Sequence, residues 1–146
     1  MAQKPYNNYI PIFTNPAIYT DYYELIMAQG YFLSGRKDER ATFDYYFRNL
    51  PFKGGYVVFA GINDLLEIFQ DYKFHPDELI FLENLGFQAT FLDYLSNLKL
   101  NLDIYSAKEG EIVFPNTLSV RVDGPLIEAQ LIETILLNII NFESLI

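Results

Sequence analysis

The chain contains no cysteine and only one histidine, and these scarcities exclude several kinds of site. Without cysteine there can be neither a disulfide framework nor a thiolate metal site. With His75 alone, no pair of histidines can ligate zinc and no zincin motif can exist. Because His75 directly precedes Pro76, we interpret it as a loop residue beside the start of a helix.

Basic residues are also few: ten lysines and arginines stand against nineteen acidic residues, which gives a formal net charge of −9. A nucleic-acid-binding surface needs clustered lysine and arginine to neutralise phosphates, so this balance argues against one. The sole local basic cluster, Arg36, Lys37 and Arg40, is interrupted by Asp38 and Glu39. We predict that it forms a solvated loop.

Signals for export or membrane insertion are missing as well. The first twenty residues lack a basic start followed by an apolar run, so they do not resemble a signal peptide. Leu126 to Ile146 is long and apolar enough to suggest a membrane span, but Glu128, Glu133 and Glu143 argue against it. We therefore expect a soluble, cytoplasmic protein with neither a membrane nor a nucleic-acid partner.

Apolar side chains, in contrast, are abundant: 51% of the residues are hydrophobic, including thirteen Phe and twelve Tyr. This content excludes disorder, and 146 residues are enough for one domain with a sizeable core. Motifs that define an active site by themselves, such as the G-x-S-x-G elbow or the Walker loop, do not occur. Lys53-Gly54-Gly55 could offer backbone N–H groups to a phosphate, but a plain turn explains it better.

One long apolar helix over Leu126–Ile146 is the element around which we expect the rest to be arranged. Gly124-Pro125 is a start signal for it. Apolar residues cover more than half of its circumference, which is typical of a helix wrapped by other elements. It ends on Leu145-Ile146 with no glycine and no basic last turn, so we expect this helix to belong to a longer chain.

A first helix is predicted from Asp21 to about Leu33, after an extended arm over residues 1–18. Asp21 and Glu24 have the spacing of a capping box, and Ser34-Gly35 suits a helix end.

Tyr23 is predicted to lie off the buried stripe of this helix, about a quarter-turn away and above Met27 and Gly30. The stripe itself is expected to contain Tyr22, Leu25, Ile26, Phe32 and Leu33.

The middle of the chain alternates strand and helix patterns. Ala41 to Arg48 alternates aromatic and polar residues and predicts a half-buried strand. Asn63 or Asp64 is expected to cap one helix, Pro76 to begin a second that ends at Gly86, and a third to follow near Phe91. Short strands are predicted over 102–107, 112–114 and 118–122, after the ambiguous run 56–60. The fold class is therefore α+β, with helices packed on an antiparallel sheet.

Three strings of residues, taken together and in order, resemble the nicotinate phosphoribosyltransferase family. The first is Thr20-Asp21-Tyr22-Tyr23-Glu24-Leu25 followed by Met27-Ala28-Gln29-Gly30-Tyr31. The second is Ala41-Thr42-Phe43-Asp44-Tyr45-Tyr46-Phe47-Arg48 with Leu50-Pro51-Phe52-Lys53-Gly54-Gly55-Tyr56 and Ala60-Gly61. The third is Glu109-Gly110-Glu111, Phe114-Pro115-Asn116, Val122-Asp123-Gly124-Pro125-Leu126, and Gln130-Leu131 with Glu133-Thr134 and Leu136-Leu137-Asn138.

The resemblance implies an enzyme of NAD salvage, of the type II phosphoribosyltransferase fold. It transfers a phosphoribosyl group from phosphoribosyl pyrophosphate to the ring nitrogen of nicotinate, and it is coupled to ATP hydrolysis with magnesium accompanying the pyrophosphate. Family members are longer, with the catalytic residues in a downstream barrel-like domain. We thus expect residues 1–125 to be the N-terminal domain and 126–146 to begin the helix that connects to that domain. No catalytic residue and no metal ligand is expected within these 146 residues.

The resemblance also implies three site residues and a dimer. Tyr23 corresponds to a tyrosine that stacks on the nicotinate ring in the partner subunit's active site, so the intact enzyme is expected to be a head-to-tail homodimer. Asp21 is a second candidate near that site, beside its role at the helix start. Arg48 resembles a basic position that meets phosphate across the dimer; a plain surface arginine is the alternative.

Other readings of the sequence remain open. The same fold could act on nicotinamide or quinolinate instead of nicotinate, or the domain could be a binding module without catalysis. For Tyr23, the alternative is a core tyrosine on a second packed face.

Overall fold

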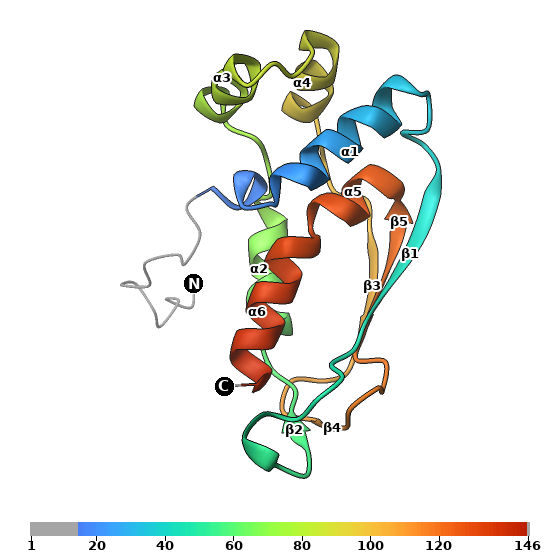
Figure 1. The fold of residues 1–146 in the computed structure, drawn as a ribbon, viewed down its shortest axis with the longest axis vertical. Coiled ribbons are helices and arrows are strands. Elements are labelled where there is room, and N and C mark those ends of the chain that lie inside the picture. Colours follow the sequence, from blue (N-terminus) through green and yellow to red (C-terminus); the bar gives the residue numbers. More distant parts are fainter. Residues whose placement is uncertain (1–14, 146) are drawn as a thin grey trace, which may run out of the picture.

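The computed structural model describes residues 15–145, and the predicted arm therefore lies almost wholly outside the described residues. A short 3-10 turn, η1 (Pro16–Ile18), leads into the first helix. A three-stranded antiparallel sheet has the order β1-β5-β3, with β1 at Arg40–Tyr45, β5 at Val120–Pro125 and β3 at Asp103–Ser106 (Figure 1). A second, two-stranded sheet pairs β2 (Val57–Val58) with β4 (Ile112–Val113).

The strand alternation read from the sequence explains the two faces of the larger sheet. Tyr45 of β1 and Val120 and Val122 of β5 are buried under the helices. On the opposite, uncovered face, Arg121 donates two hydrogen bonds to the carboxylate of Asp44, at 2.7 and 2.9 Å. The predicted strand 41–48 is confirmed, although its regular part ends at Tyr45.

Six α-helices complete the described domain (Figure 1): α1 (Tyr22–Leu33), α2 (Ile62–Gln70), α3 (Pro76–Asn84), α4 (Ala89–Ser96), α5 (Leu126–Leu131) and α6 (Glu133–Leu145). Helix α5 lies between α1 and the strands β1 and β5, while α6 runs beside α2 and contacts β2. Helices α3 and α4 pack on each other at one end of the molecule. The predicted α+β architecture with antiparallel strands is confirmed.

The single long apolar helix predicted over Leu126–Ile146 is wrong, because the helix breaks at Ile132 into α5 and α6. Ile132 (φ −89°, ψ −4°) ends α5, and its carbonyl then accepts the N–H of Leu136 to begin the next helix. The two pieces bury their apolar residues against different neighbours, α5 on α1 and the sheet, α6 on α2. Within residues 15–145, no helix has the length and apolar character needed to cross a membrane.

The predicted buried stripe of α1 is also mostly wrong. The buried residues of this helix are Glu24, Leu25 and Ala28. Three members of the predicted stripe are about half exposed instead, namely Tyr22 (53%), Ile26 (48%) and Leu33 (49%). The reason is that α1 packs its Glu24 side against α5, and Glu24 accepts a hydrogen bond from Thr134 at the start of α6.

Helix starts were predicted with mixed success. Helix α3 begins at Pro76 as expected, and the Glu78 carboxylate accepts the His75 N–H at 2.7 Å. Helix α2 begins at Ile62, one residue before the predicted caps, and Asn63 and Asp64 lie inside it. The capping box of Asp21 and Glu24 does not form: Asp21 is the N-cap residue of α1, but its side chain makes no capping hydrogen bond.

The core is assembled around α5 and α6, as the apolar composition of that stretch indicates. The largest fully buried apolar side chains are Phe59, Phe91, Leu65, Leu82, Leu95, Ile127, Leu131, Ile132, Ile135, Ile140 and Val120.

Candidate functional site

The first turn of α1 meets the beginning of α6, and Tyr23 lies at this junction. Its side chain is 50% exposed, and Met27 and Gly30 on the same side of the helix are exposed too. The prediction that Tyr23 is off the buried face is therefore confirmed, and the core-tyrosine alternative is wrong. A Cβ placed on Gly30 would meet no atom within 4 Å, so the surface beyond Tyr23 is open.

Glu24, beside Tyr23, is a fully buried carboxylate at the centre of a hydrogen-bond network. One of its oxygens accepts the hydroxyl of Thr20. The other accepts the hydroxyl of Thr134 at 3.1 Å and that of Tyr23 at 3.4 Å. A buried charge is tolerated only when its lone pairs are satisfied, and these three donors meet that need.

Asp21 contributes through its backbone, whose N–H donates to the Thr134 hydroxyl oxygen at 3.3 Å. Its side chain is exposed and makes no capping hydrogen bond to the first turn of α1. Asp21 therefore lies at the junction with Tyr23, but it does not act as a side-chain cap.

The junction is strongly acidic. Desolvation raises the pKa of the Tyr23 hydroxyl above its ordinary value of 10.0, and the carboxylates of Glu133, Glu24 and Asp21 raise it further. Burial likewise raises the pKa of Glu24 above 4.5, although the hydroxyls of Thr20 and Thr134 oppose the shift. At neutral pH Tyr23 thus presents a neutral phenol ring, which can stack on another aromatic ring.

Arg48, the third predicted site residue, follows β1 on the exposed surface. It lines a groove of about 240 Å³ between the sheet and α5 and α6, together with Tyr46, Glu133 and Leu137. Among residues 15–145 the ion pairs involve other cations, so Arg48 keeps its guanidinium available in this groove. Glu133 lies near both the groove and Tyr23, because it lines the groove and its charge raises the pKa of Tyr23.

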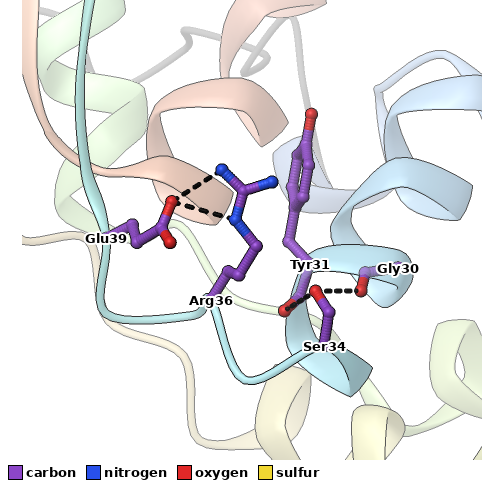
Figure 2. Close-up of polar contacts among 5 residues, drawn as sticks. All are labelled: Gly30, Tyr31, Ser34, Arg36 and Glu39. Atoms are coloured by element: carbon purple, nitrogen blue, oxygen red, sulfur yellow. Dashed lines mark hydrogen bonds and ion pairs between the residues drawn. The ribbon is translucent and has the colours of Figure 1, made fainter.

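The basic cluster after α1 is not part of this site. Figure 2 shows the guanidinium of Arg36 held by Glu39, at 3.0 and 2.7 Å, and lying over the Tyr31 ring at 5.5 Å from its centroid. Ser34 ends the helix by donating to the carbonyls of Gly30 and Tyr31 (Figure 2). The other two cations, Lys37 and Arg40, pair with Asp38 and Asp103. The side chains of Arg36, Lys37 and Arg40 are exposed, as predicted. The predicted loop is confirmed for Arg36 and Lys37 but not for Arg40, which begins β1.

Three residues that the sequence reasoning missed shape the junction: Glu24, Glu133 and Thr134. The sequence predicted a capping box for Glu24 and used Glu133 as a charge that argues against a membrane span. Nothing local marks a carboxylate as buried. In the part of the chain that the structure describes, no three acidic or histidine side chains are arranged to hold a metal ion.

The mixed helix-and-sheet fold is known from other proteins. Residues 18–141 match the family model of the nicotinate phosphoribosyltransferase N-terminal domain. The nicotinate phosphoribosyltransferase of Bacillus subtilis is 44% identical over 131 residues, which are 89% of this chain and 27% of that protein. The Dictyostelium discoideum enzyme of the same name is 37% identical over 146 residues, 98% of this chain and 24% of that protein.

Solved structures agree with the sequence comparisons. The crystal structure of human nicotinic acid phosphoribosyltransferase matches with a TM-score of 0.80 and 31% identity, over 86% of this chain and 26% of that one. The nicotinate-nucleotide pyrophosphorylase of Pyrococcus furiosus matches with a TM-score of 0.58 at 15% identity, over 96% of this chain and 27% of that one, and it shares the fold alone.

The chain belongs to the nicotinate phosphoribosyltransferase N-terminal domain family. It spans about a quarter of the length of the curated relatives that it matches.

Proposed function

We propose that this chain is the N-terminal domain of a type II phosphoribosyltransferase of NAD salvage. The intact enzyme would convert nicotinate and phosphoribosyl pyrophosphate into nicotinate mononucleotide and pyrophosphate, and the domain alone would be inactive. The match of residues 18–141 to the family, together with relatives bearing this activity in their names, supports the proposal. Residues 126–146 would lead into the phosphoribosyltransferase domain, and α5 and α6 within them contribute many residues to the core of this one.

The role proposed for Tyr23 is to stack on the nicotinate ring in the active site of the partner subunit. The supporting observation is that the neutral phenol side chain of Tyr23 is half exposed, on a side of α1 where the surface around Gly30 is open. An offset-stacked aromatic pair contributes about 0.5–1.5 kcal/mol beyond burial. Orienting the ring also places its nitrogen for attack on the anomeric carbon, since positioning supplies much of the rate of such transfers.

The charges around Tyr23 indicate that the anion-binding groups come from elsewhere. Nicotinate carries a carboxylate, whereas Asp21, Glu24 and Glu133 make the Tyr23 junction acidic. Arg48, in the groove beside Glu133, is the cation of this chain that we propose to meet phosphate across the dimer. Phosphate and carboxylate both favour the planar guanidinium fork of arginine.

A head-to-tail homodimer is part of the same proposal. The outer side of α1 exposes Tyr23, Ile26 and Met27 in neighbouring turns. Contiguous apolar surface of this kind marks a face that another protein surface covers. The dimer would lie in the cytoplasm, with no membrane or nucleic-acid partner.

ATP and magnesium would act in the intact enzyme, away from this domain. The described residues offer no suitable set of metal ligands, so no step of the chemistry is assigned to a metal here. The contribution of this chain is to bind and orient the ring and to keep water from one side of it.

The test is an assay of the intact enzyme that carries this domain, with nicotinate, nicotinamide and quinolinate, each with and without ATP. We expect turnover of nicotinate, stimulated by ATP, and little with the other two rings. Preferred turnover of nicotinamide or quinolinate would change the substrate, and no turnover of any ring would favour a binding module without catalysis.

A further inference from the structure

Glu24 does more than its place in the first turn of α1 requires. An exposed carboxylate in the first turn stabilises a helix by its interaction with the positive end of the helix dipole. The Glu24 carboxylate, however, is 0% exposed. It accepts hydrogen bonds from Thr20, Tyr23 and Thr134, which come from the turn before α1, from α1 itself and from α6. Burying a charge costs free energy unless hydrogen bonds compensate for the lost water. The three donors around Glu24 provide that compensation and fix the positions of the groups that bear them.

Thr134 closes the arrangement from the side of α6. Its hydroxyl donates to Glu24 at 3.1 Å and accepts the backbone N–H of Asp21 at 3.3 Å. One side chain thereby holds both the backbone before Tyr23 and the carboxylate after it. Thr134 stands two residues after the break at Ile132, in the first turn of α6.

We propose that Glu24 and Thr134 are positioning residues that hold the first turn of α1 and the ring of Tyr23 in the orientation needed to receive a pyridine ring. The inference rests on the proposed function, because it assigns to these two residues the preorganisation of the stacking surface. Tyr23 is half exposed and would otherwise rotate about its side-chain bonds, and a ring fixed in advance loses less entropy on binding.

Three carboxylates, Asp21, Glu24 and Glu133, act on the hydroxyl of Tyr23 from the start of α1 and from α6. Among them Glu24 alone is hydrogen-bonded to that hydroxyl. Its removal should therefore be visible at Tyr23 itself, independently of catalysis, as a fall of the Tyr23 pKa toward 10.0.

The experiment compares Thr134→Val, Thr134→Ser and Glu24→Gln in the intact enzyme. Thr134→Val keeps the shape of the side chain and removes both hydrogen bonds, while Thr134→Ser keeps the hydroxyl. We expect Thr134→Val and Glu24→Gln to raise the KM for nicotinate roughly threefold to tenfold with a smaller change in kcat, and Thr134→Ser to keep the wild-type KM.

Asn138→Ala is the matched control, since the Asn138 amide bonds only the Thr134 carbonyl one turn away, at 2.8 Å. Its KM should equal that of the wild type. A merely structural role of Thr134 would lower the amount of folded enzyme in Thr134→Val and leave KM unchanged.

A second arm titrates ¹³C-labelled tyrosines of this chain by NMR, with Tyr23→Phe to assign the signal. A lowered Tyr23 pKa in Glu24→Gln is expected from the loss of charge alone. A changed Tyr23 signal in Thr134→Val, which alters no charge, supports the inference, and an unchanged signal contradicts it. In the kinetic arm, Tyr23→Ala separates the two claims. An unchanged KM in Tyr23→Ala overturns the stacking role itself; a raised KM there, with unchanged KM in Thr134→Val and Glu24→Gln, overturns the positioning role alone.

Discussion

The carboxylate of Glu109 accepts a hydrogen bond from the backbone N–H of Gly61 at 2.9 Å, across 48 residues of sequence. Its second oxygen accepts the N–H of Asn63 at 3.4 Å. Glu109 therefore supplies the cap of α2 that the sequence led us to expect from Asn63 or Asp64. The negative charge of this carboxylate also interacts favourably with the positive, N-terminal end of the helix dipole.

Removing this long-range cap should destabilise the domain. For Glu109→Ala we expect a loss of about 1 kcal/mol in the free energy of unfolding, because backbone donors of the first turn are left without an acceptor. Urea unfolding of the chain measures it. Glu67→Ala, an exposed glutamate within α2, is the control and should change little. An equal effect of both substitutions would show that Glu109 is not a cap.

We predict that substitution of Gly61 destabilises the domain more than substitution of another glycine with a similar backbone conformation. Gly61 (φ 97°) and Gly86 (φ 94°) both adopt the left-handed region. A Cβ on Gly61 would lie 3.0 Å from Ile139 Cγ2 and 3.3 Å from the Ile139 carbonyl oxygen, whereas one on Gly86 would meet nothing within 4 Å.

Both glycine-to-alanine variants should lose about 1 kcal/mol from conformational strain, and Gly61→Ala should lose about 1 kcal/mol more from the contact with α6. Thermal unfolding of the two variants side by side measures the difference. Equal melting temperatures would contradict the close packing of Gly61 on α6.

A pH dependence of stability follows from Glu128 in α5. Burial raises the pKa of its carboxyl above 4.5, although the Asn101 N–H and Arg40 oppose the shift. The folded chain thus binds this proton more tightly than the unfolded chain does. The stabilisation is fully present below about pH 4.5 and is lost as the pH rises through the folded pKa.

Glu128→Gln removes this titration and can keep the Asn101 hydrogen bond. Its stability relative to wild type should therefore increase as the pH rises from about 4.5. Glu39→Gln should change in the opposite sense and at lower pH. The hydrogen bonds from Arg36 lower the pKa of Glu39 below 4.5, so their stabilisation is present above about pH 4.5 and is lost as the pH falls through the folded pKa. Urea unfolding between about pH 2.5 and pH 7.5 measures both slopes, and a flat difference for Glu128→Gln would contradict the account.

The parts of the fold that were predictable from sequence are those with local causes. Alternating aromatic residues around Tyr45 predicted β1, and Pro76 with Glu78 predicted the start of α3. The break at Ile132 could not be predicted, since no glycine or proline marks it and the apolar residues on all sides suit one helix or two.

The candidate site was predictable only in part, for the same reason. Periodicity placed Tyr23 off the buried face of α1, and the structure agrees. The burial of Glu24 depends on Thr134, 110 residues later in the chain, and such a partner leaves no local signal. The roles of Tyr23, Asp21 and Arg48 came from the family resemblance and stay predictions.

The central claim is that Tyr23 stacks on nicotinate, and it is tested most directly by the KM for nicotinate of Tyr23→Ala against Tyr22→Ala in the intact enzyme. Tyr22 is as exposed as Tyr23, at 53% against 50%, but its ring packs edge-on against Phe87 of the same domain at 6.0 Å. We predict a KM raised roughly twofold to tenfold in Tyr23→Ala and unchanged in Tyr22→Ala. An unchanged KM in Tyr23→Ala, or an equal rise in both variants, would contradict the account.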